Sequence, residues 1–329
     1  MANVEFKTLN NGEKMPFIGI GTWQASDEEI ETAIDAALEA GYRHIDTAPV
    51  YGNEQAIGRV LKRWLDAGKV KREELFIVTK LPPVANGPSD VEPTIKKSLA
   101  DLQLSYVDLY LIHTPFSLYT NEDGSFKLDE EGLMTPDLRT NHAATWVEME
   151  KLVAEGLAKS IGVSNFDKEQ VGRLLKSAKI RPATNQIEHH VYLQQRELVD
   201  FCKAEGIAIT AYSPLGSRGI AAFNAAAGLV RDLPDLIEIP VVKEIAAAHG
   251  KTPAQVLLRW IIDTGVIAIP KSTNAGRLRE NLNVFDFKLT DAEVAKLLAL
   301  DQDLRVCDFA FFHGVERHPE FRFKNQYTK

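Results

Sequence analysis

Four side chains able to move a proton stand at or just beyond the ends of strand-like runs in this sequence. Asp46 and Tyr51 lie in the stretch GYRHIDTAPVYGNE (residues 41–54), Lys80 ends the run FIVTK, and His113 ends the run LYLIH. Carboxylates are disfavoured inside strands, so Asp46 marks the point where a strand gives way to a loop. Taken singly, each residue also has an ordinary structural explanation, as a loop or turn residue, a surface lysine or a buried histidine. Their shared position at strand ends favours one common site.

Together, the four groups suit the delivery of a proton to a carbonyl oxygen. A phenol is a weak acid at neutral pH, with an ordinary pKa of about 10. An adjacent ammonium, that of Lys80, favours the phenolate and so makes Tyr51 a stronger donor, while the Asp46 carboxylate keeps the ammonium charged and in place. A neutral His113 can donate an N–H to the same oxygen and orient it. The predicted chemistry is therefore general acid catalysis by Tyr51.

Alternating strands and helices must position these groups. Eight strand-like runs are found at residues 17–22, 44–48, 75–81, 107–113, 160–166, 184–189, 207–214 and 266–272. Amphipathic helical windows lie between or after them at 26–41, 53–68, 89–102, 142–156, 167–178, 194–206, 252–265 and 274–285. This alternation predicts a parallel sheet covered by helices, and eight cycles favour a closed (β/α)8 TIM barrel over an open doubly wound sheet. In such a barrel the strand ends share one rim, which would bring the four groups together.

Three further segments are long for loops, namely 116–140, 216–236 and the tail from about residue 302. Two of them follow the fourth and seventh predicted strands and would rise from the same rim. The tail is too aromatic for a disordered end, and we expect it to cover an apolar surface. At the other end of the chain, alternating apolar residues around Asn11-Gly12 predict a β-hairpin.

The composition is that of an ordinary globular protein and fits one domain spanning residues 1–329. Of its 329 residues, 45% are hydrophobic and 26% charged, and the net charge of −8 argues against nucleic-acid or anionic-membrane partners. The polar N-terminus, the lack of a membrane-length apolar run and only two distant cysteines predict a cytoplasmic location. We expect a monomer that binds a small molecule.

Two other kinds of site are disfavoured by the spacing of their residues. Adjacent His189 and His190 lie in a predicted strand and would point to opposite faces, so we expect no metal site there or elsewhere. The stretch GIGTWQ (residues 19–24) lacks the third glycine of a dinucleotide-binding fingerprint, which argues against a Rossmann fold.

Several motifs, in order and over nearly the whole chain, resemble the signatures of the aldo-keto reductases. They include GYRHIDTAPVYGNE, VDLYLIHTP, SIGVSNF, NQIEHHVYL, AYSPLG and IPKSTNAGRLRENLNVFDF. The resemblance implies a (β/α)8 barrel with an N-terminal β-hairpin closing the bottom and NADPH/NADP bound across the opposite face. It also implies that Tyr51, Lys80, Asp46 and His113 form the catalytic set, with hydride coming from the nicotinamide. The tail is similar to that of the insect 3-dehydroecdysteroid reductase-like subgroup.

The resemblance assigns cofactor contacts residue by residue. The nicotinamide end would meet Ser164, Asn165, Gln186 and Tyr212, the pyrophosphate Ser213, Leu215 and Ser217, the 2′-phosphate Lys271, Ser272 and Arg277, and the adenine Glu280 and Asn281; Gly21, Thr22, Trp23, Asp46 and Thr273 complete the set. For the 2′-phosphate, the residue types themselves support the contacts that the resemblance implies. Lys271 and Arg277 flank a predicted helix start, where backbone N–H groups and an arginine fork favour a phosphate.

The substrate pocket departs from the pattern of many family members, which carry tryptophans where this chain has Pro82 and Thr114. The loss of two rings predicts a wider pocket, or one refilled by phenylalanines. The residues expected to line it are Trp23, Val50, Tyr51, His113, Thr114, Phe116, Phe223, Phe309, Phe311 and Phe312. A lysine–aspartate pair that clasps the cofactor in some members is replaced by Gln24 and Gly219, which predicts easier cofactor exchange.

The predicted function is NADPH-dependent reduction of aldehydes and ketones to alcohols, with tolerance of bulky apolar carbonyls such as steroid-like ketones. The alternative is a non-catalytic NADPH-binding regulatory subunit, because the potassium-channel β subunits resemble this fold and retain the same four residues. The long aromatic tail favours the enzyme.

Overall fold

The computed structural model describes residues 4–229 and 232–323, and its described residues contain one eight-stranded parallel sheet in sequence order. The strands are β3 (Ile20–Gly21), β4 (His44–Asp46), β5 (Phe76–Leu81), β6 (Val107–Ile112), β7 (Ala158–Ser164), β8 (Thr184–Glu188), β9 (Ala208–Tyr212) and β10 (Ile267–Ala268). Parallel bridges join Ile18 to Ala268 and Gly21 to Lys271, so the first strand meets the last. The predicted (β/α)8 barrel is confirmed.

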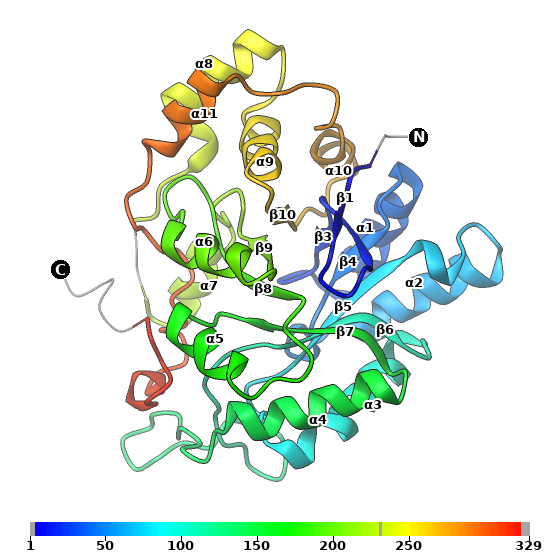
Figure 1. The fold of residues 1–329 in the computed structure, drawn as a ribbon, viewed down its shortest axis with the longest axis vertical. Coiled ribbons are helices and arrows are strands. Elements are labelled where there is room, and N and C mark those ends of the chain that lie inside the picture. The colour runs from blue at the N-terminus through cyan, green and yellow to red at the C-terminus, as the bar shows by residue number, and fades with distance from the viewer. Residues whose placement is uncertain (1–3, 230–231, 324–329) are drawn as a thin grey trace.

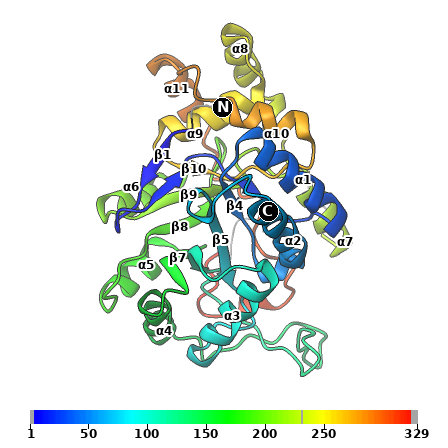
Figure 2. The same cartoon turned by 90° about the vertical axis from the view of Figure 1, so that its right-hand side faces the viewer.

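All eight predicted helices are present, with bounds within a few residues of those expected. They are α1 (Asp27–Ala40), α2 (Glu54–Asp66), α3 (Val91–Leu102), α4 (His142–Ala154), α5 (Lys168–Leu175), α6 (Arg196–Ala204), α9 (Pro253–Asp263) and α10 (Ala275–Leu282). Figure 2 shows them around the central strands. Their ends follow the sequence signals: Ser26 begins α1 with a capping box, and Gly41 ends it in a left-handed conformation.

Three helices were not predicted. They are α7 (Ile220–Ala226), α8 (Pro240–His249) and α11 (Asp291–Leu298). The first lies within the long segment 216–236, whose alanine-rich stretch favours a helix once it is held at the rim. The start of α11 could have been recognised in the sequence, because Thr290 and Glu293 form a capping box there.

The N-terminal hairpin closes the bottom of the barrel, as expected. Its strands β1 (Phe6–Thr8) and β2 (Lys14–Pro16) pair antiparallel. Leu9 and Met15 are buried in a cluster with residues from four barrel strands, among them Phe76 and Leu109. The larger core lies between the barrel and its helices. No helix in the described residues is long and apolar enough to cross a bilayer.

Candidate active site

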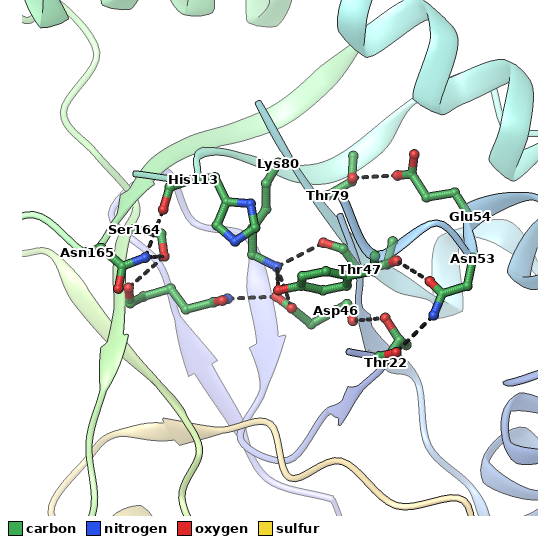
Figure 3. A network of polar contacts seen from close by, with 12 residues as sticks. Thr22, Asp46, Thr47, Asn53, Glu54, Thr79, Lys80, His113, Ser164 and Asn165 are labelled. Carbon is green, nitrogen blue, oxygen red and sulfur yellow. Dashed lines mark hydrogen bonds and ion pairs between the residues drawn. The ribbon is translucent and has the colours of Figure 1, made fainter. Parts of the chain in front are cut away.

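A buried ion pair joins the ends of β4 and β5. The Lys80 ammonium donates to Asp46 Oδ1 at 2.6 Å, to the Thr47 carbonyl at 2.8 Å and to the Tyr51 hydroxyl at 3.4 Å. Figure 3 shows Lys80 between Asp46, Thr47 and His113. The Lys80 side chain is 0% exposed and that of Asp46 is 2% exposed. All three ammonium protons therefore have an acceptor, which is the condition for keeping a charged lysine in the interior.

Electrostatics at this site keep the lysine charged and the imidazole neutral. Burial opposes the charged form of Lys80, but Asp46 and Tyr51 hold its pKa above the usual value. Burial, assisted by the Lys80 charge, lowers the pKa of His113 well below its usual value. Burial also raises the pKa of Tyr51, although Lys80 pulls it down. The expected effect of Lys80 on Tyr51 is present, but burial outweighs it, so the phenol is protonated at neutral pH.

Tyr51 and His113 face one another across the barrel mouth. Their ring centroids are 5.8 Å apart with an interplanar angle of 78°. Tyr51 ends the short 3-10 helix η1 (Pro49–Tyr51), which the left-handed Gly52 terminates. The buried His113 Nδ1 has no partner among the described residues. A phenol and an imidazole thus flank one point from two sides, with the ammonium behind the phenol.

Asp46 is held by more than the lysine. Gln186 on β8 donates to Asp46 Oδ2 at 2.6 Å, and Thr22 donates its hydroxyl to the Asp46 carbonyl at 2.9 Å. Both were predicted only as cofactor contacts. In this structure Gln186 also fixes the carboxylate against the lysine, and Thr22 holds the Asp46 backbone.

Asn53, which the sequence analysis missed, fastens the Tyr51 loop to the barrel. Its amide donates to the carbonyls of Thr22 and Ala25 at 2.9 and 3.2 Å, and its carbonyl accepts from Thr47 at 3.4 Å. The next residue, Glu54, is also buried. The available signal was the amide and acid directly after Tyr51 in the motif YGNE.

The residues expected around a nicotinamide do gather beside this set. Asn165 donates to the carbonyl of His113 at 2.8 Å and to the hydroxyl of Ser164 at 3.1 Å (Figure 3), and it accepts from the Tyr212 hydroxyl at 2.8 Å. Ser164 in turn donates to the backbone carbonyl of Gln186 at 2.8 Å. Two amides and two hydroxyls linked between Asp46 and His113 form a donor and acceptor set that fits a carboxamide.

Backbone strain is concentrated at the same rim. Five of the non-glycine residues with positive φ lie here. A positive φ costs free energy in a residue with a side chain, and such residues are typical of functional loops. The five are Gln24, Asn165, Ser213, Ser217 and Phe309. The loop of Ser213, Leu215 and Ser217 follows β9 and contains the left-handed Gly216, and alternating turns of this kind can bind a phosphate through backbone N–H groups.

A cationic patch lies at the start of α10. Lys271 and Arg277 are exposed, Ser272 is buried, and the guanidinium Nε of Arg277 approaches the Ser272 hydroxyl at 3.4 Å. Among residues 4–229 and 232–323, no carboxylate forms an ion pair with either cation. The predicted residues Thr273, Glu280 and Asn281 are nearby in the chain, with Glu280 exposed and Asn281 buried on α10. Unpaired cations at a helix start fit an anionic ligand.

Gly21 has a structural reason for being glycine. A Cβ at this position would lie 2.8 Å from the Ile269 carbonyl, so a side chain would separate the first and last strands. Its predicted cofactor contact is therefore not needed to explain it.

Aromatic side chains pack together around Phe116, close in the chain to one of the positions that lack a tryptophan. Phe116 is fully buried and contacts the rings of Phe309, Phe312 and Phe321 at centroid distances of 5.6, 6.3 and 5.6 Å. Thr114 is also buried and donates to the carbonyl of Phe116 at 2.8 Å. These two residues therefore form the buried base on which the rings of the tail pack.

A second aromatic contact joins three segments above the site. Phe223 on α7 packs edge-on against Trp23 at 5.2 Å and against Phe311 of the tail at 4.9 Å. Phe223 is 37% exposed and Val50 is 48% exposed, so both are accessible at the rim. The tail thus covers an apolar surface, as expected from its composition.

The two positions of the missing clasp do meet. A Cβ on Gly219 would lie 2.5 Å from Gln24 Oε1, so the loop after β9 approaches the end of β3 at this point. Neither residue is charged, so no ion pair joins the two segments here. The rings of Trp23 and Phe223 provide an apolar contact between them.

Comparisons with known proteins agree with this geometry. Residues 17–302 match the sequence model of the Aldo/keto reductase family. The chain is 47% identical over 298 residues to aldo-keto reductase family 1 member A1 of Mus musculus, covering 90% of this chain and 89% of the relative. Member A1 of Gallus gallus is 41% identical over 333 residues, with 99% of each chain covered. The solved structure of the aldose reductase from Schistosoma japonicum has a TM-score of 0.87 and 40% identity, covering 98% of this chain and 100% of that one.

Proposed function

Since the chain belongs to the aldo/keto reductase family, we propose that it reduces aldehydes and ketones to alcohols with NADPH as the hydride donor. The observation that carries the proposal is the buried Lys80, which contacts both Asp46 and the hydroxyl of Tyr51 opposite His113. Burying a charged lysine costs free energy because the ammonium loses its hydration. A role in catalysis would explain why the protein keeps such a group in its interior.

The residues of the chain have distinct roles in this reaction. Reduced nicotinamide, when bound, supplies hydride to the carbonyl carbon. Tyr51 donates its phenolic proton to the carbonyl oxygen, and Lys80 stabilises the phenolate that this leaves. The neutral His113 donates an N–H to the same oxygen and so orients the substrate and stabilises developing negative charge. The hydride and the proton together convert the carbonyl to an alcohol, and the phenolate regains its proton from water.

The chain's own groups fit the proposed cofactor at both of its ends. The amide of Gln186 contacts Asp46 and that of Asn165 contacts the His113 carbonyl, while the cations Lys271 and Arg277 lack a carboxylate partner among the described residues. A 2′-phosphate at these cations would distinguish NADPH from NADH. The aromatic wall of Trp23, Phe223 and the tail supports tolerance of bulky apolar carbonyls, including steroid-like ketones.

A panel of carbonyls tests the proposal. Short aliphatic aldehydes, aromatic aldehydes and steroid ketones would each be mixed with NADPH, and loss of NADPH absorbance followed. Turnover with one or more classes is expected. Tight NADPH binding without turnover of any class would instead favour a regulatory NADPH-binding subunit.

We also propose that the protein is a monomer, which light scattering on the purified chain would test.

Replacing Arg277 with alanine should weaken NADPH binding by about 10- to 100-fold, because a charge-assisted hydrogen bond contributes about 1.5–3 kcal/mol. NADH affinity should change less than about twofold, since NADH lacks the phosphate that the guanidinium would meet. Fluorescence titration with both cofactors measures the two dissociation constants. Arg279→Ala, an exposed arginine on the same helix, is the matched control. Equal weakening of both cofactors by Arg277→Ala would contradict the phosphate role.

Adding the missing ion pair should slow cofactor release. In the double variant Gln24→Lys/Gly219→Asp, opposite charges would meet where the two segments already touch. Gly219 has φ of −72° and begins α7, so an aspartate fits its backbone. An exposed pair contributes up to about 1 kcal/mol, which predicts release of NADP slowed by about two- to fivefold in stopped-flow fluorescence. The two single variants are the controls, and unchanged release in the double variant would show that the missing pair does not set the exchange rate.

A further inference from the structure

Glu188 is a fully buried carboxylate at the end of β8 that the mechanism above does not use. Its side chain is 0% exposed. Residues two apart on a strand share a face, so Glu188 points to the same side of the sheet as Gln186, which contacts Asp46. A buried carboxylate requires strong partners, and its position at the barrel mouth raises the question of what it holds.

Both carboxylate oxygens accept backbone N–H groups from the tail. Val306 N donates to Oε1 at 2.6 Å, and Cys307 N donates to Oε2 at 2.9 Å. His190 Nε2 lies 2.9 Å from Oε1, and Arg305 Nη1 lies 3.8 Å from Oε2. Two charge-assisted bonds to consecutive amides fix both the position and the direction of the chain at this point.

A second contact supports the same segment from the turn that follows β8. The carbonyl of Tyr192 accepts from Gln302 N at 3.1 Å and from Leu304 N at 2.9 Å. The guanidinium of Arg305 reaches Gln195, whose own amide donates to the Glu188 carbonyl at 2.6 Å. The tail is thus attached to β8 and its following turn just before its phenylalanines begin.

The anchored amides directly precede the aromatic wall. Phe309 follows Cys307 by two residues and packs on Phe116, and Phe311 packs on Phe223 at the rim. The Cys307 thiol is close enough to Tyr51 to affect the phenol electrostatically. A shift of the tail at residues 306–307 would therefore move the rings that pack on Phe116 and Phe223.

We propose that Glu188 is a positioning residue for substrate selection, which holds the tail through the amides of Val306 and Cys307 and so places Phe309 and Phe311 in the pocket wall. The consequence for selectivity rests on the proposed carbonyl reduction, whereas the anchoring does not. Large apolar carbonyls need the wall for binding, and small ones need only the catalytic set.

The test replaces Glu188 with glutamine, which keeps the shape but has one acceptor oxygen for two N–H donors. Amide hydrogen exchange at Val306 and Cys307 should become about tenfold faster or more, while exchange in β5 and β6 stays unchanged. With NADPH, kcat/KM for a steroid ketone should fall about tenfold, through KM, and that for propanal less than about twofold. Glu197→Gln is the matched control, since this exposed carboxylate pairs with Lys168.

Two further measurements keep the inference open to refutation. In a double-mutant cycle, Phe309→Ala should lower kcat/KM for the steroid ketone and add little to the loss in Glu188→Gln, because both act through the same wall. If Glu188→Gln does not fold, the unmodified protein still provides a test. Its Val306 and Cys307 amides should exchange more slowly than those of Ala310 and Phe312, which bond only within local turns.

The outcomes separate this inference from the proposed function. Unchanged exchange at residues 306–307 in Glu188→Gln would overturn the anchoring. Equal losses for the steroid ketone and propanal would overturn the role in selectivity. If the unmodified protein reduces no carbonyl of the three classes in the panel, the proposed function fails, and hydrogen exchange alone decides whether Glu188 holds the tail.

Discussion

Tyr51→Phe should lower the rate of carbonyl reduction by about 10²- to 10⁴-fold, the range that a positioned general acid contributes. The hydroxyl of Tyr51 is the group that Lys80 contacts, and no other phenol stands opposite His113 in the described part of the site. Without it, the forming alkoxide has no proton donor on that side. Single-turnover kinetics with saturating NADPH would measure the chemical step directly.

The same variant should bind NADPH almost as well as the unmodified protein. Phenylalanine keeps the ring that packs edge-on against His113, and the cationic patch on α10 lies on another part of the rim. Fluorescence titration provides this control, and circular dichroism checks the fold. Normal turnover by Tyr51→Phe would show that the proton comes from another group.

Lys80→Met should both abolish turnover and destabilise the fold. Removing one partner of a buried pair leaves the other charge uncompensated, which costs about 3–5 kcal/mol in the free energy of unfolding. Here the Asp46 carboxylate would keep only the amide of Gln186 as a hydrogen-bond partner among the described residues. Denaturant unfolding followed by tryptophan fluorescence would measure the loss of stability, and NADPH oxidation the loss of turnover.

A double variant separates these two effects. In Lys80→Met/Asp46→Leu no buried charge is left unpaired, so much of the lost stability should return while turnover stays absent. A single variant Lys80→Met that is as stable as the unmodified protein would mean that the Asp46 charge is better solvated than its burial indicates. Turnover in the double variant would refute the role of the pair in tuning Tyr51.

The meeting of Asp46, Lys80 and His113 at one rim could be predicted because it depends on local signals. Asp46, Lys80 and His113 each end an apolar run, and parallel strands that alternate with helices bring such ends to one rim. The caps of α1 and the Asn11-Gly12 turn are likewise short-range patterns. The helix α7 was missed because it lies in a segment without an amphipathic repeat long enough to read.

The net acid strength of Tyr51 could not be predicted in the same way. The sequence places a lysine where it can lower the pKa of the phenol, and that contribution is present. Whether this lowering outweighs the rise in pKa caused by burial depends on how much water reaches the hydroxyl. The surrounding tail and loops determine that access.

The sequence by itself determined the barrel, its eight strands and the family, and it placed Asp46, Lys80 and His113 at strand ends. Strand periodicity, helix caps and each single motif depend on residues that are close together in the chain. Only the tertiary structure decided which partners hold these groups. Gln186 reaches Asp46 across 140 positions of the chain, and Val306 reaches Glu188 across 118. Such contacts arise when the barrel closes and the tail folds back over it, and they depend on distances of a few ångströms that no local pattern records.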